Sequence, residues 1–240
     1  MALTNGLSAI GDAIREKTGG TDLIPFLDMP DAIRSISGGG TTAPNPLEYA
    51  TKINYTYQDA VFEPNYELTL TLPNVIDLAS AFYGAKNIKK IILKGNDNGN
   101  TVIFTSLVRN CIDVVTVDLT EYNAKFSSGN MTFYYASALT EILGELDFTE
   151  CTTAQYMFQN CTNLETITPK ANSIKISISF AQSSKLSTNS IKSIIDGLAT
   201  VETVQTLTLN AEQKVLQSHI DSANAKGWTV AGGKVVQEAW

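Results

Sequence analysis

Apolar residues recur at every third position in several stretches of this 240-residue chain. In FQNCTNLETI the repeated positions are Phe158, Cys161, Leu164 and Ile167. A strand turns alternate residues to one face, and an α-helix mixes steps of three and four, so a sustained step of three is typical of neither. The pattern predicts a tight helical or 3₁₀ turn that leads into a short strand.

The same pattern returns along the chain as a large residue, a small residue and two aliphatic residues, three positions apart. The four full copies are Phe82, Ala85, Ile88 and Ile91; Val108, Cys111, Val114 and Val117; Phe133, Ala136, Leu139 and Ile142; and Phe158, Cys161, Leu164 and Ile167. A fifth copy has Phe180, Ser183 and Leu186, with Asn189 at its last position. The large residues are 26, 25, 25 and 22 positions apart, which is the period of a solenoid.

The repeat predicts a stack of coils around one continuous core. A single coil cannot bury its own apolar face, so neighbouring coils must pack on one another. The small residue of each copy is expected where adjacent coils approach most closely. An interpretation as unrelated amphipathic helices fails, because a step of three drifts around a helix and runs such as IIL and VTVDL favour strands.

The copy FQNCTNLETITP resembles the BspA-like (Treponema-type) leucine-rich repeat, F-x-x-C-x-x-L-x-x-I followed by proline, here Pro169. Other copies depart from this form: Val108 replaces the aromatic residue, and no proline follows Leu93 or Leu119. The resemblance covers residues 76–186, about four to five repeats of 22–26 residues. It implies a right-handed leucine-rich-repeat solenoid with a parallel β-sheet on one face, a scaffold generally used for binding rather than catalysis.

Residues 1–37 predict a small helical module in which the apolar stripe of LSAIGDAI ends at Gly19 and a second short helix follows. The text LSAIGDAIREKTGGTDLIPFLDMPDAIRSI resembles an N-terminal module of tail and baseplate-associated proteins of phages and prophages of Gram-positive bacteria. The resemblance implies a module for attachment to other tail proteins or for assembly. A stripe this small is not stable alone, so a homo-oligomer through residues 3–36 is one expectation.

The rest of the chain divides into a linker and two caps around the solenoid. Residues 38–47 read as a flexible linker, and residues 48–75 as an N-terminal β cap with strands in YATKINYTYQDAVF and YELTLTLP. Residues 187–240 predict an α+β C-terminal cap, with a helix in SIKSIIDGL, strands in QTLTL and WTVAGGKVV, and a second helix started by Asn210 and Gln213. The predicted fold class is therefore an α/β repeat with a short parallel-sheet solenoid.

Charge and hydropathy exclude several classes of partner. The formal net charge of −7 argues against binding to nucleic acid or to an anionic membrane surface. No window approaches the roughly 18 apolar residues that a membrane helix needs, and the first residues lack the features of a secretory signal. The chain is thus expected to be made in the cytoplasm and not to insert into a membrane. The cysteines, Cys111, Cys151 and Cys161, are odd in number, have no CxxC spacing and predict buried thiols.

Catalytic, cofactor and metal chemistry finds little support. The lone histidine, His219, has no nucleophile or carboxylate at a suitable helical spacing, so a solvated helix position is the favoured interpretation. The segment Asn96–Asn100 has oxygen side chains like a calcium loop but no bidentate Glu at the required offset, which favours a turn between coils. The carboxylates that could form a glycosidase pair have no diagnostic spacing: they are Glu141, Glu145, Asp147 and Glu150.

Tyrosines are the better candidates for a functional surface. Tyr83, Tyr134, Tyr135 and Tyr156 follow or neighbour the large repeat position, so some of them are expected to form a ridge. Aromatic ridges bind proteins and sugars well, although core packing is the alternative for at least half of them. With the two resemblances, they predict a non-enzymatic phage or prophage tail protein that recognises a protein or glycan in the virion. The alternatives are a BspA-like cell-surface adhesin and, third, a glycan hydrolase.

Overall fold

A computed structural model of the chain describes Leu47 and residues 50–237. The chain divides into two compact units, Met1–Tyr49 and Ala50–Trp240, and only the second is described below. The predicted helical module of residues 1–37 and all of the linker except Leu47 lie outside the described residues.

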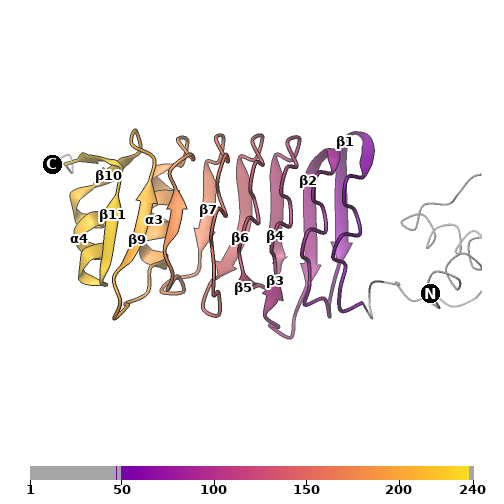
Figure 1. The fold of residues 1–240 in the computed structure, drawn as a ribbon, viewed down its shortest axis with the longest axis horizontal. Coiled ribbons are helices and arrows are strands. Elements are labelled where there is room, and N and C mark those ends of the chain that lie inside the picture. The colour runs from indigo at the N-terminus through magenta and orange to yellow at the C-terminus, as the bar shows by residue number, and fades with distance from the viewer. Residues whose placement is uncertain (1–46, 48–49, 238–240) are drawn as a thin grey trace, which may run out of the picture. The chain divides into compact units, whose positions relative to one another are not determined.

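The second unit is a solenoid-like α/β fold around a curled parallel sheet (Figure 1). Seven strands form this sheet: β1 (Val61–Thr71), β2 (Lys86–Gly95), β3 (Val102–Ile103), β4 (Thr116–Tyr122), β5 (Ala124–Ser128), β6 (Glu141–Asp147) and β7 (Thr166–Pro169). Their order is β1-β2-β4-β6-β5-β3, with β7 also beside β6, and every pairing is parallel. Coils of 25 or 26 residues bring β2, β4, β6 and β7 side by side in successive coils.

The other side of each coil is a run of hydrogen-bonded turns. These turn segments, residues 53–60, 78–85, 104–111, 129–136 and 154–161, are together called the turn ladder. Each segment contains two residues with positive φ, for example Ser106 and Asn110 at 56° and 62°. A helical or 3₁₀ turn has negative φ throughout, so the predicted helical turn is wrong.

Hydrogen bonds between backbones join the segments of the turn ladder. Every second N–H group donates to a carbonyl of the next coil, as in Phe82 N to Leu107 O at 3.0 Å and Val108 N to Thr132 O at 2.9 Å. A trans peptide directs its N–H and C=O in opposite directions. The peptide groups therefore form columns in which all N–H groups point toward the C-terminal end of the stack.

The core lies between the sheet and the turn ladder. All sixteen repeat residues of the four full copies are buried, with at most 1% of each exposed. Phenylalanine rings stack between coils on both sides: Phe133 on Phe158 at 5.4 Å, and Phe104 on Phe126 at 4.2 Å. The small repeat position lies against the neighbouring backbone, because the Cys111 thiol donates to Phe82 O at 2.7 Å.

The stack begins one coil earlier than the repeat suggests. Residues 54–59 form turns where a strand was expected, and β1 contains only Val61 and Phe62 of that stretch together with YELTLT of the second. The Tyr57 ring stacks on Phe82 at 5.1 Å, so this segment is the first of the turn ladder. Its repeat was not apparent because Glu63 and Tyr66 occupy the positions of the two aliphatic residues.

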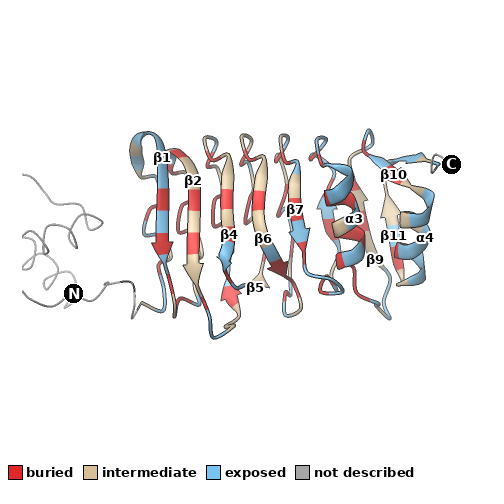
Figure 2. Cartoon of the chain, turned by 180° about the vertical axis from the view of Figure 1, so that it is seen from behind, coloured by how far each residue is buried: buried red, intermediate tan, exposed pale blue. Residues whose placement is uncertain are grey.

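In the C-terminal cap, a helix lies on the sheet side and strands lie on the side of the turn ladder. Its elements are β8 (Ile178–Phe180), α3 (Thr188–Gly197), β9 (Gln205–Leu209), β10 (Lys214–Leu216), α4 (Gln217–Ala225), β11 (Trp228–Ala231) and β12 (Lys234–Val236). Helix α3 lies beside β7, where the next strand would be, and Figure 2 shows it on the same side as the strands. Strands β11, β9 and β8 form a parallel sheet on the side of the turn ladder (Figure 1).

Two residues of the cap differ from their predicted roles. Helix α4 begins at Gln217, so Asn210 and Gln213 do not start it. Their amides instead donate to earlier coils: Asn210 to Ala181 O and Gln213 to Leu186 O, both at 2.7 Å. In the fifth repeat copy, Phe180, Ser183 and Leu186 are buried, whereas Asn189 lies exposed on α3.

Candidate recognition surface

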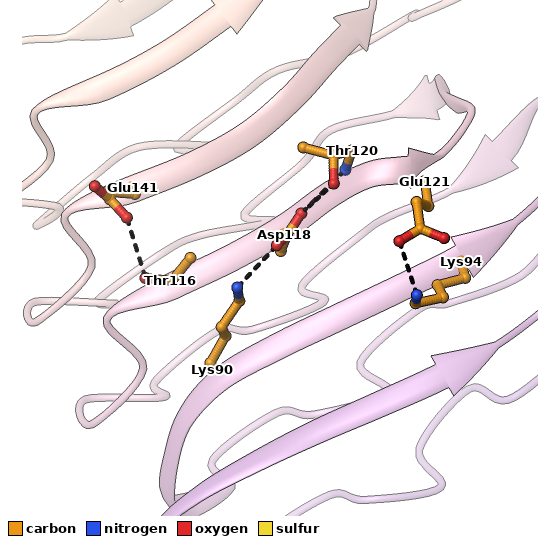
Figure 3. A network of polar contacts seen from close by, with 7 residues as sticks. All are labelled: Lys90, Lys94, Thr116, Asp118, Thr120, Glu121 and Glu141. Atoms are coloured by element: carbon orange, nitrogen blue, oxygen red, sulfur yellow. Dashed lines mark hydrogen bonds and ion pairs between the residues drawn. The ribbon is translucent and has the colours of Figure 1, made fainter.

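Charged side chains on the sheet side pair with one another across neighbouring strands (Figure 3). Lys90 on β2 lies 2.9 Å from Asp118 on β4, and Lys94 lies 2.7 Å from Glu121. Partial burial alone would raise the pKa of Asp118, but hydrogen bonds from Lys90 and Thr120 outweigh it and hold the pKa below its usual value. These charges are satisfied within the sheet.

The turn side presents aromatic groups around one arginine. The Arg109 guanidinium lies between two half-buried rings, 5.3 Å from the centre of Tyr83 and 5.1 Å from that of Tyr134. Tyr135 packs beside Tyr134 at 4.6 Å and is 45% exposed. Sequence reasoning missed Arg109, although it occupies the position after the large repeat residue, as Tyr83 and Tyr134 do. We call these four residues the tyrosine–arginine cluster.

Tyr156, the fourth predicted tyrosine, lies apart from this cluster. It is 49% exposed and lines a groove of about 390 Å³ between the last segment of the turn ladder and the C-terminal cap. One wall comes from residues 154–159 and the other from residues 177–182 with Thr206 and Thr208. Glutamine, serine, threonine and Tyr156 supply its polar groups, and no charged side chain among the described residues lines it.

A second hollow, of about 600 Å³, lies at the carboxyl ends of β1, β2 and β4. Its lining includes Lys94 and Glu121, which are paired with each other, and Tyr122 and Asn123. Asn96 next to it is fully buried: its amide donates to Asn123 O at 2.6 Å and its oxygen accepts from Asn100 N at 3.0 Å. The Asn96–Asn100 segment is therefore a turn closed by its own side chain.

Two of the four candidate carboxylates, Glu141 and Asp147, have structural partners. Glu141 accepts a hydrogen bond from Thr116 at 3.4 Å, and Asp147 lies 2.7 Å from Lys170. Burial would raise the pKa of Asp147, but hydrogen bonds from Lys170 and Thr149 lower it below its usual value. No group of three His, Cys, Asp or Glu side chains suitable for a metal occurs among the described residues.

The remaining candidate groups lie away from both surfaces. His219 is half-buried on α4, and its Nδ1 has no hydrogen-bond partner in the described part of the chain. Burial raises the pKa of Cys111 and Cys161 to about 12, so both thiols stay protonated. Neither helix among residues 50–237 has the length and hydropathy of a membrane span.

Comparisons with protein-family models, with curated proteins and with solved structures returned no match.

Proposed function

We propose that this chain is a non-enzymatic recognition protein that binds a protein or a glycan through the turn side of its solenoid. The observation that carries the proposal is the difference between the two sides. On the sheet side, Lys90 and Lys94 are paired with Asp118 and Glu121, whereas the turn side presents Tyr135 and Tyr156 with nearly half of each side chain exposed. Exposed tyrosines provide a large contact area at low conformational-entropy cost, which suits recognition.

The biological setting that we propose is the tail of a phage or prophage. The repeat text at 158–169 supports a right-handed, BspA-like leucine-rich-repeat solenoid, and the text at 7–36 supports a module that attaches to tail proteins or forms a homo-oligomer. In this setting the protein is made in the cytoplasm and assembled into the virion. A BspA-like cell-surface adhesin is the second candidate, and the same exposed tyrosines would support it.

Binding of the full chain to an array of bacterial surface glycans and to immobilised cell-surface proteins tests the proposal. The wild type should bind at least one of them, and the double substitution Tyr135→Asn with Tyr156→Asn should weaken that binding about tenfold or more. Asparagine suits this test because both positions have positive φ, which asparagine tolerates. Unchanged binding by the double variant, or release of shortened glycans, would contradict the proposal.

Light scattering separates the two settings. An oligomeric full chain and a monomeric chain starting at Pro46 would favour the tail protein, because assembly would then depend on the N-terminal module. If both are monomers, the adhesin becomes as well supported as the tail protein.

A further inference from the structure

We propose that the groove beside Tyr156 binds an N-acetylated saccharide, whose acetamido carbonyls accept hydrogen bonds from the backbone N–H groups of Ala154, Tyr156 and Phe158. This inference rests on the proposed recognition function and assigns it a site and a ligand class.

The turn segment before this groove donates hydrogen bonds to the coil that follows it. Segment 129–136 sends four N–H groups to carbonyls of the next coil. They are Gly129 N to Thr153 O, Met131 N to Gln155 O, Phe133 N to Met157 O and Tyr135 N to Gln159 O, at 2.8, 2.9, 3.1 and 2.8 Å. The same four positions of the last segment, 25 residues later, are Ala154, Tyr156, Phe158 and Asn160.

Only one of these four N–H groups finds an acceptor in the described part of the chain. Asn160 N donates to the side-chain oxygen Oε1 of Gln182 at 2.7 Å. The N–H groups of Ala154, Tyr156 and Phe158 have no hydrogen bond to any described residue. Phe158 is only 1% exposed, and buried backbone donors without an acceptor are rare in folded proteins. These three donors are therefore available to an acceptor that enters the groove.

The ladder stops here because the following coil changes its conformation. Its equivalent segment forms strand β8, which pairs with β9 and accepts no backbone hydrogen bond from the described residues 154–160. The Phe158 and Phe180 rings still stack at 4.5 Å, so the aromatic column continues into this coil. The groove lies between residues of the last turn segment and residues of the following coil.

On the sheet side, a side chain of the following coil bonds to backbone groups at the same boundary between coils. The Ser190 hydroxyl of α3 accepts from Ile167 N at 3.1 Å and donates to Glu165 O at 2.8 Å. The Ser190 side chain thereby takes two of the backbone hydrogen bonds that a further strand beside β7 would make. On the turn side, Gln182 does the same for Asn160 alone.

The three free N–H groups lie at the positive end of aligned peptide columns. Aligned peptide dipoles place partial positive charge at the end where N–H groups are free, and hydrogen-bonded chains strengthen one another. In each earlier coil the partner of these N–H groups is an amide carbonyl. An acetamido group offers the same carbonyl on a neutral sugar.

The other groups of the groove favour a saccharide over an extended peptide. Gln155 and Gln159 side chains, with Ser179 and Thr208 hydroxyls, both donate and accept hydrogen bonds, which matches the hydroxyl groups of a sugar. The Tyr156 ring offers an apolar face, and the absence of charged lining suits a neutral ligand. The volume of about 390 Å³ fits a small ligand, whereas β8, with three residues, is a short edge for strand addition.

Nuclear magnetic resonance titration of the ¹⁵N-labelled full chain with N,N′-diacetylchitobiose tests the proposal. The amide protons of Ala154, Tyr156 and Phe158 should shift and become protected from exchange, with a dissociation constant on the order of 1 mM. Gly129, Met131 and Phe133 should not respond. Cellobiose, which has hydroxyls in place of the acetamido groups, should bind at least about fivefold more weakly.

Two variants test whether the groove is the binding site, and one peptide tests whether the ligand is a saccharide. Tyr156→Asn should weaken binding about threefold to tenfold, whereas Tyr55→Asn, the same change at the equivalent exposed tyrosine with positive φ in the first turn segment, should leave it unchanged. Binding of acetyl-tetraalanine amide that equals or exceeds that of the disaccharide would overturn the saccharide assignment. Shifts at the tyrosine–arginine cluster alone, or no shift at all, would overturn this groove as the site. The proposed recognition function would fail only if the array and protein tests also failed.

Discussion

The sheet side and the turn side of the coils pair their backbone N–H and C=O groups in different ways. On the sheet side, strands pair in parallel, Lys90 pairs with Asp118 across two strands, and Ser190 bonds to the backbone of the last strand. On the turn side, residues with positive φ direct peptide groups along the stack, and the last segment leaves three N–H groups without a described partner. The last strand of the sheet side thus bonds to α3, whereas three N–H groups of the last turn segment remain available to a ligand.

The largest expected effect is on the aromatic column of the turn side. Phe158 lies between Phe133 and Phe180, at 5.4 and 4.5 Å. Phe158→Ala should reduce the free energy of unfolding by about 3–5 kcal/mol, because it removes a buried ring and leaves a cavity. Phe126→Ala, in the column with Phe104 and Phe148, is the matched change on the sheet side, and urea denaturation measures both. A loss below about 1 kcal/mol for Phe158→Ala would show that the turn side does not share the core.

A backbone clash on the sheet side should have the next largest effect. Gly144 has a φ of 94°, and a Cβ atom there would lie 2.6 Å from the carbonyl carbon and oxygen of Leu119. Gly144→Ala should destabilise the protein by about 2–3 kcal/mol, since both the conformation and the contact are unfavourable. Thermal unfolding of this variant beside Gly99→Ala, where the nearest atom is a side-chain nitrogen at 3.3 Å, isolates the clash. Equal losses in the two variants would contradict the role of the Leu119 backbone.

On the turn side, a single residue with positive φ should matter less. Asn110 has a φ of 62°, and Asn110→Ala should cost about 1 kcal/mol because alanine disfavours this conformation. Asn110→Gly should retain most of the stability, which distinguishes the backbone from the weak contact of the asparagine amide with Tyr83, at 3.4 Å. The urea midpoints of the two variants distinguish these causes. If Asn110→Gly were as unstable as Asn110→Ala, the loss would come from the asparagine side chain and not from the backbone conformation.

The smallest expected effect comes from the paired charges of the sheet. Asp118→Asn should reduce stability by about 0.2–1 kcal/mol at pH 7, as for other partly exposed ion pairs. Because the folded-state pKa of Asp118 lies below its unfolded value, its contribution is present above the unfolded pKa and is lost as the pH falls through the folded pKa. Urea denaturation between pH 7 and pH 2 should therefore show the variant and the wild type converging in acid. A constant difference would mean that ionisation of Asp118 is not the cause.

The sequence predicted the parts of this fold that depend on residue size and spacing. The step of three with a period near 25 located the buried column from Phe82 to Ile167, because burial in a solenoid repeats with the coil. The turn conformation was missed although Gly84, Asn110 and Asn160 stand at one of its positive-φ positions. Tyr135 occupies that position in another coil. It interrupts the recurrence of glycine and asparagine that would have indicated positive φ, since a bulky residue rarely adopts this conformation.

The groove could not be predicted, because it depends on where the ladder stops rather than on any motif. Tyr156 was selected as a possible surface residue, but nothing local distinguishes its N–H from that of Met131, which has a partner. The difference arises in the next coil, where β8 pairs with β9 instead of continuing the turns. Arg109 was missed for a similar reason, since its two tyrosines lie one coil away on either side.

Hydrogen exchange of backbone amides in the full chain without ligand tests the central difference most directly. The amides of Gly129, Met131 and Phe133, which donate to the next coil, should exchange slowly. Those of Ala154, Tyr156 and Phe158 should exchange at least about tenfold faster, although Phe158 is just as buried as Phe133. Equal protection of the two sets would mean that the last segment already has its acceptors, and would contradict an open edge on the turn side.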